Sequence, residues 1–126
     1  RAARGQIAAL TSRLDEAQHA EVLEMGKDMD STMVAIEEVL YQTKLKSNQD
    51  MLNYPIRLNN KLAHVGSLAS MGLYRPTAQM VGVRDAVTLE IDKELTKWYA
   101  LRDAQLPALN AAIRTHEIDM IALPED

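Results

Sequence analysis

The feature that most constrains the fold is a pair of long apolar stripes at helical spacing. Apolar residues recur mostly three or four positions apart from Ile7 to Leu40, and a second stripe of the same period runs from Val83 to Ile113. The chain has only five Gly and four Pro in 126 residues, so little interrupts the stripes. This pattern predicts an all-α fold built from long amphipathic helices.

We expect an antiparallel bundle of three long helices, at about residues 4–45, 52–71 and 77–117. Gly26 costs about 1 kcal/mol relative to Ala inside a helix, and Pro107 removes a backbone hydrogen bond. The first helix is therefore expected either to be continuous or to break near Gly26, and a kink or a break is expected at Pro107. The length of 126 residues predicts a single domain, residues 1–126.

The ends of the second and third helices carry their own signals. Pro55 suits the first turn of a helix, where a missing N–H does no harm, and Gly72 suits the position just after a helix end. Pro76 disfavours a helical residue before it, so the third helix is predicted to begin near Thr77. The tail HEIDMIALPED has no clear periodicity.

The predicted second helix is apolar on two sides, which favours a position between the two other helices. Its first turns nevertheless carry Arg57, Asn59 and Asn60. We interpret these three residues as a structural polar cluster, whose partly buried groups fix the register of the three helices. The functional alternative is that the same residues, together with Trp98 and Tyr99, bind a small ligand or a peptide.

The helices have unequal predicted lengths, so a hairpin arrangement leaves two ends without a neighbour. Each of these ends carries an apolar stripe that needs burial. The breaks near Gly26 and Pro107 could fold these ends back, or another protein surface could cover them. The candidate interface residues are Ile7, Leu10, Leu14, Leu106, Leu109 and Ile113.

The net charge and the absence of known motifs argue against several classes of function. The net charge is −4, and no basic stripe appears, so we expect no nucleic-acid partner. No run of 18 apolar residues occurs, so we expect no membrane insertion. Glu16 and His19 form a single Glu-x-x-His, whereas di-iron bundles use two copies. We expect no metal, no cofactor and no catalysis by this chain, and we expect Glu90 and Glu94 to be solvated or paired with basic residues.

Three segments carry a resemblance to a known family. They are YQTKLKSNQDMLNYPIRLNNKL at residues 41–62, RPTAQ at 75–79 and LPALN at 106–110. The set resembles the C-terminal helical region of large bacterial secreted proteins described as sortilin-like, or as glycosyl-hydrolase-like β-propeller proteins with BNR repeats. The resemblance covers residues 28–113, and NYPIRLNNKLA is its most specific piece.

The resemblance implies an exported parent protein, periplasmic or extracellular, in which the helical region follows the propellers. Any hydrolase activity would belong to the propellers. The chain begins with Arg1, and we expect it to be a C-terminal piece of that parent. We therefore predict a non-catalytic accessory or assembly domain that packs on the rest of its parent or associates with itself.

Overall fold

The computed structural model describes residues 1–47, 53–71 and 74–119, and every regular element in them is helical. The chain divides into two compact units, and each is described here by itself. Unit 1 comprises Arg1–Met33 and Tyr99–Asp126, and unit 2 comprises Val34–Trp98. The predicted all-α class is confirmed for the described residues.

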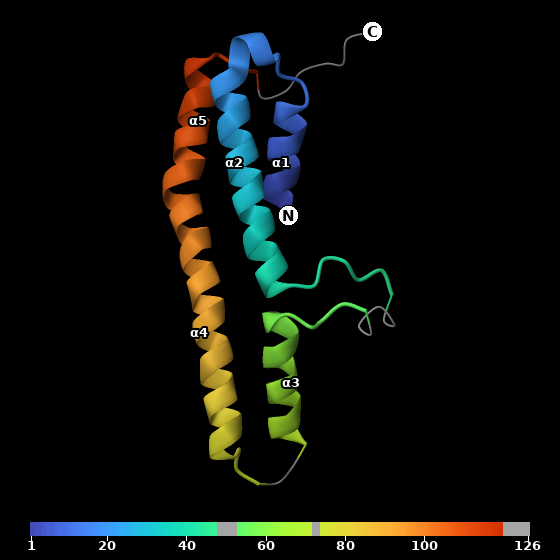
Figure 1. Cartoon of the computed structure of the whole chain (residues 1–126). Coiled ribbons are helices and arrows are strands. Elements are labelled where there is room, and N and C mark those ends of the chain that lie inside the picture. The colour runs from blue at the N-terminus through green and yellow to red at the C-terminus, as the bar shows by residue number, and fades with distance from the viewer. Residues whose placement is uncertain (48–52, 72–73, 120–126) are drawn as a thin grey trace. The chain divides into compact units, whose positions relative to one another are not determined.

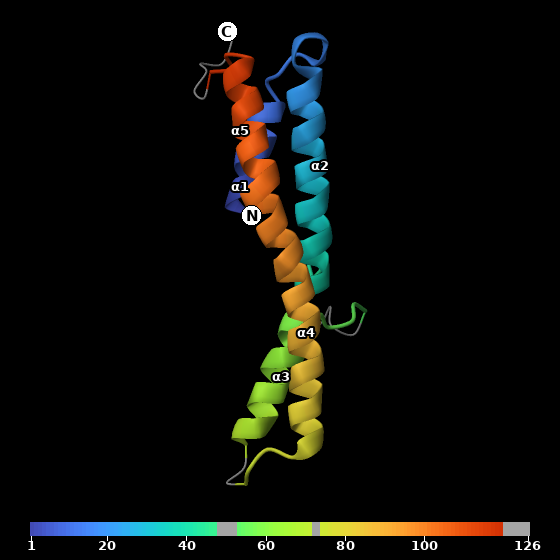
Figure 2. The same ribbon diagram turned by 90° about the vertical axis from the view of Figure 1, so that its left-hand side faces the viewer.

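Unit 1 contains α1 (Ala2–Thr11), most of α2 (Glu16–Leu40), the π-helical turn η2 (Leu101–Gln105) and α5 (Leu106–Thr115). In Figures 1 and 2, α1 and α5 both lie beside α2, and α2 runs in the opposite direction to each of them. The apolar stripes of the three segments meet between them. The buried apolar residues of this core are Ile7, Val22, Leu23, Met29, Met33, Leu101, Leu109 and Ile113.

The first predicted helix is interrupted, but between Thr11 and Glu16 and not near Gly26, where a break was the alternative to a continuous helix. α1 ends at Thr11 and α2 begins at Glu16, whereas the backbone stays helical through Gly26. Asp15 starts α2, because its carboxylate accepts a hydrogen bond from the backbone N–H of Ala17 at 3.1 Å. The described residues therefore form four helical rods instead of three: α1, α2, α3 and the unbroken run α4–η2–α5.

Gly26 serves the packing of α1 against α2 and does not break a helix. A Cβ atom at this position would lie 2.8 Å from Thr11 Cγ2 and 3.4 Å from Ile7 Cγ2. Glycine thus permits a close approach of the two helices that alanine would obstruct. An ion pair between Arg4 Nε and Asp30 Oδ1, at 2.6 Å, joins the same two helices.

Pro107 does not break the helical run. The turn before it widens into the π-helix η2, and the backbone N–H of Leu106 donates to the carbonyl oxygen of Leu101, five residues back. Proline has no N–H for the residue four positions earlier and its ring crowds that carbonyl group, so a wider turn relieves both problems. α5 then continues with Pro107 in its first turn, where proline is tolerated.

Unit 2 contains the end of α2, together with α3 (Leu58–Ser70) and α4 (Ala78–Ala100), whose last two residues belong to unit 1. α3 and α4 lie side by side and antiparallel, as a helical hairpin (Figures 1 and 2). The start of α4 agrees with the prediction, because the Thr77 hydroxyl accepts a hydrogen bond from the N–H of Met80 at 3.2 Å. The third predicted helix extends to Thr115, close to the expected 117.

The beginning of α3 differs from the prediction. Pro55 precedes the helix, and Arg57, with an extended backbone, occupies the position before its first residue. The carbonyl oxygen of Pro55 instead accepts a hydrogen bond from the Gln42 side chain at 2.8 Å, which holds the connection between α2 and α3. The predicted stop at Gly72 lies outside the described residues.

The expectation that this helix lies between two neighbours is also wrong. Within unit 2, α3 lies along α4, while the last turns of α2 end above α3 instead of running beside it (Figures 1 and 2). α3 consequently has no buried residue at all. The buried apolar residues described in unit 2 are Ile36 and Val87.

Candidate functional site

The six residues predicted as an interface do not form exposed stripes. Ile7, Leu109 and Ile113 are only 2–6% exposed, and they belong to the core of unit 1. Leu10, Leu14 and Leu106 are half-buried in the same unit. α1 and α5 pack on α2 and cover each other's apolar residues, so the reason for placing an intermolecular contact there is removed.

The predicted polar cluster is divided between two environments. Asn59 and Asn60 are exposed in the first turn of α3, so the expectation of buried amides is wrong. Arg57 is half-buried, and its Nε atom is shielded from solvent and has no hydrogen-bond partner among the described residues. A buried donor without a partner costs about 1–3 kcal/mol.

The apolar side of α3 that packs on α4 is only partly buried. α3 presents one apolar row, Leu58, Leu62, Val65 and Ala69, at the predicted helical spacing, and each of the four is only half-buried. Two helices can cover one side of such a row, whereas a closed core needs a third element or a second layer. The apolar row of α3 therefore agrees with the sequence pattern, but within unit 2 only α4 runs along it.

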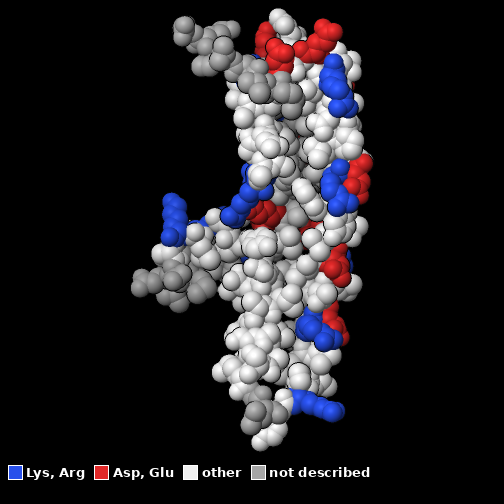
Figure 3. Space-filling model, turned by 180° about the vertical axis from the view of Figure 1, so that it is seen from behind, with Lys and Arg blue, Asp and Glu red and all other residues white. Residues whose placement is uncertain are grey.

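Exposed apolar side chains gather at the turn end of the hairpin. We name Leu68, Met71, Tyr74 and Val83 the tip cluster: they flank the α3–α4 turn, and they are 45%, 78%, 90% and 50% exposed. Figure 3 shows that charged side chains in this part of the molecule follow one edge, along α4 and down to the turn, and that the surface beside this edge is uncharged. Clustered apolar exposure of this kind marks an interaction surface more often than scattered single residues do.

Sequence reasoning missed the tip cluster because it followed the helical stripes only. A signal was nevertheless present: the segment LASMGLYRPT carries large apolar residues beside Gly72 and Pro76, where a solvated turn is normally polar. Arg75 is the exposed cation of this turn. The tip cluster therefore combines apolar contact area with one positive charge.

Two glutamates of α4 lie in contrasting surroundings. Glu94 is buried, and its carboxylate accepts a hydrogen bond from Lys97 Nζ at 2.6 Å. The prediction that it is paired is therefore confirmed, although it is not solvated. Glu90 is exposed, and the hydrogen bond and positive charge of Lys93, whose Nζ lies 2.8 Å from Glu90 Oε1, lower the pKa of Glu90.

The fold brings together two histidines that are distant in the sequence. The rings of His19 and His116 lie 6.1 Å apart, and His116 Nε2 is 3.2 Å from Glu21 Oε2. His19 Nδ1 is buried, and no described residue forms a hydrogen bond with it; the backbone of α2 leaves helical geometry at this residue. Among the described residues, no group of three or more His, Cys, Asp or Glu is arranged to hold a metal ion.

Comparisons with known proteins give no relative for this chain. No family model, no curated protein and no solved structure matches the chain. The described helices also lack a stretch long and apolar enough to cross a membrane. The surfaces of the two units are therefore the evidence on function.

Proposed function

We propose that this chain is a non-catalytic accessory or assembly domain, which contacts another protein surface through the tip cluster. The observation that supports this proposal is a contrast between the units. Unit 1 buries eight large apolar residues, whereas Val87 is the one apolar residue buried in the described part of α3 and α4, and the tip cluster is exposed. Burying the tip cluster in an interface would be favourable at about 25 cal/mol per Å² of apolar surface.

The partner we propose is the rest of an exported, glycosyl-hydrolase-like β-propeller parent. The support for the parent is the resemblance of residues 41–62, 75–79 and 106–110. The support for the contact surface is independent of it and comes from the tip cluster. Self-association through the same cluster is the alternative assembly, because an incomplete hairpin can also be closed by a second hairpin.

The experiment tests the surface and the partner separately. The 126-residue chain is titrated against the preceding part of its parent by calorimetry, and its own association is followed by sedimentation velocity. Leu68→Glu combined with Tyr74→Glu should weaken whichever association occurs, since it places two charges in the buried area. Ala9→Glu, at an exposed position of α1, is the matched control and should leave binding unchanged.

Two results contradict the proposal. Tip variants that bind as tightly as the wild type would remove the tip cluster as the contact surface. A chain that binds neither its parent nor itself at micromolar concentration would remove the assembly function. A small-molecule or peptide function around Arg57 and Asn59 would gain support if ligand binding were lost on Arg57→Met while assembly was unchanged.

A further inference from the structure

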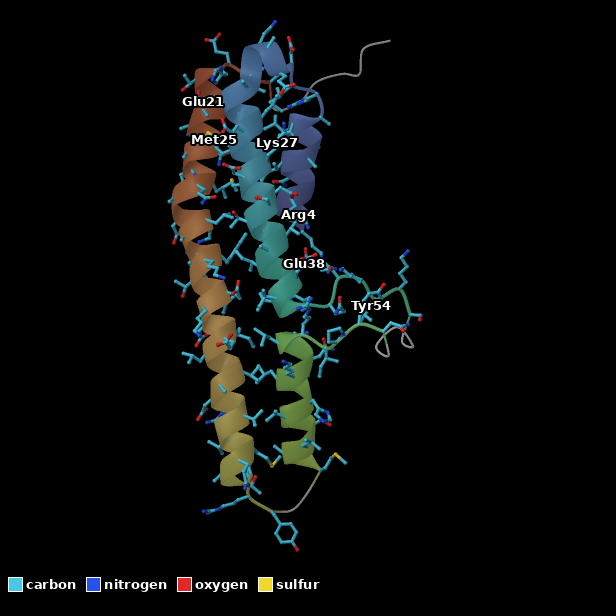
Figure 4. All side chains as sticks on the ribbon, in the orientation of Figure 1. Arg4, Glu21, Met25, Lys27, Glu38 and Tyr54 are labelled. Carbon is cyan, nitrogen blue, oxygen red and sulfur yellow. The ribbon has the colours of Figure 1, made fainter. Side chains whose placement is uncertain are left out.

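A groove of about 500 Å³ lies in unit 1, between α2 and the η2–α5 segment. This volume is within the range of about 300–1,000 Å³ that is typical of small-molecule sites. α2 contributes Met25 and Met29, one helical turn apart, and the opposite wall contains Ala104 and Ala108, also one turn apart. In Figure 4, Met25 lies on the side of α2 that faces α5.

The space arises from residue size and from the π-helical turn. Two alanines face two methionines, so one wall has short side chains where leucines would fill the gap. Ala104 also belongs to the widened turn that accommodates Pro107, and such π turns occur often at functional sites. Methionine side chains are flexible and polarisable, which lets them adapt to ligands of different shape. The floor of the groove is therefore apolar and adaptable.

Polar groups line the groove without partners of their own. Within residues 1–47, 53–71 and 74–119, the side chains of Asp28, Thr32 and Gln105 form no hydrogen bond or ion pair. The hydroxyl group of Ser31, in contrast, is used internally, since it donates to the backbone carbonyl oxygen of Asp28 at 2.9 Å. The lining holds one carboxylate and no cationic side chain, so its formal charge is negative.

We propose that this groove binds an organic cation, an ammonium group carrying an apolar chain. The Asp28 carboxylate pairs with the ammonium group, and Met25, which is half-buried above the core residue Met29, contacts the chain. The Thr32 hydroxyl and the Gln105 amide oxygen supply additional acceptors around the charged end. An anion is excluded by Asp28, and a neutral molecule of the same size leaves that carboxylate without a counter-charge.

The test compares three probes of equal chain length on the full 126-residue chain: hexyltrimethylammonium, 1-hexanol and hexanoate. Binding is followed by the backbone amide shifts of the labelled protein during titration. We expect the cation to move the amides of residues 28, 32 and 105, with hexanol binding at least about tenfold more weakly and hexanoate not at all. Equal binding of the cation and hexanol, or shifts confined to other residues, would overturn the proposal.

Two variants locate the site. Asp28→Asn should weaken cation binding by about tenfold or more and leave hexanol binding unchanged, because only the charge is removed. Ala108→Leu should abolish binding of both by filling the groove. Asp92→Asn, at an exposed position on α4, is the charge-matched control and should bind the cation like the wild type. Unchanged affinity of a folded Asp28→Asn protein would contradict the assignment.

Discussion

Gly26→Ala offers a direct test of how α1 packs on α2. The new Cβ atom would lie 2.8 Å from Thr11 Cγ2, well inside van der Waals contact. Thr11 cannot easily turn away, because threonine is stiff at χ1 and its hydroxyl donates to the carbonyl oxygen of Ile7 at 2.9 Å. The helices must therefore separate or the threonine must give up that hydrogen bond.

The magnitude follows from two opposing terms. Alanine gains about 1 kcal/mol over glycine in helix propensity, whereas overpacking of a tight contact costs typically about 1–3 kcal/mol. We expect Gly26→Ala to lower the free energy of unfolding of unit 1 by about 1 kcal/mol. Urea denaturation followed by circular dichroism at the helix band measures this difference, provided that the slope of the transition stays constant.

Two further variants separate packing from propensity. Gly5→Ala lies in α1 of the same unit and meets no atom within 4 Å, so it should raise stability by a few tenths of a kcal/mol to about 1 kcal/mol. Thr11→Ser deletes the obstructing methyl group and keeps the hydroxyl, so Gly26→Ala should become neutral or stabilising in that background. If Gly26→Ala stabilises the wild-type chain as much as Gly5→Ala does, the close-approach argument is refuted.

Three other predictions concern a buried leucine, an ion pair and a carboxylate. Leu101→Ala, at a position only 1% exposed, should cost about 2–5 kcal/mol of unfolding free energy in the same denaturation assay. A double-mutant cycle on Arg4 and Asp30 should give a coupling of about 0.2–1 kcal/mol that decreases with added salt, since the two side chains are 32% and 40% exposed. Lys93→Gln should raise the pKa of Glu90 toward its ordinary value, as measured by nuclear magnetic resonance titration of its carboxyl carbon.

The sign of the last effect also fixes its pH window. Because Lys93 holds the pKa of Glu90 below its ordinary value, the stabilisation is present above that ordinary value and is lost as pH falls through the lowered one. Leu89→Ala, at a position 59% exposed, is the control for Leu101→Ala and should change stability by less than about 0.5 kcal/mol. A Glu90 pKa that does not respond to Lys93→Gln, or a coupling that ignores salt, would contradict the respective interpretation.

The sequence alone determined the helical class and most helix surfaces. Spacings of three and four predicted which side of each helix is apolar, and Pro76 predicted a helix start near Thr77, whose hydroxyl accepts a hydrogen bond from the N–H of Met80 in the structure. These features depend on contacts within a few residues. Asp15 and Gln18 also formed a capping signal for α2 that could have placed the first break correctly.

Only the tertiary structure decided what each apolar face meets. Gly26 is unfavourable in an isolated helix, but a neighbouring helix needs the space that glycine leaves. Pro107 could have ended a helix, but a π turn absorbed it because Leu101, Leu109 and Ile113 on either side are held in the core of unit 1. Whether a stripe becomes core or exposed surface depends on distant segments of the chain, and periodicity along one helix carries no information about them.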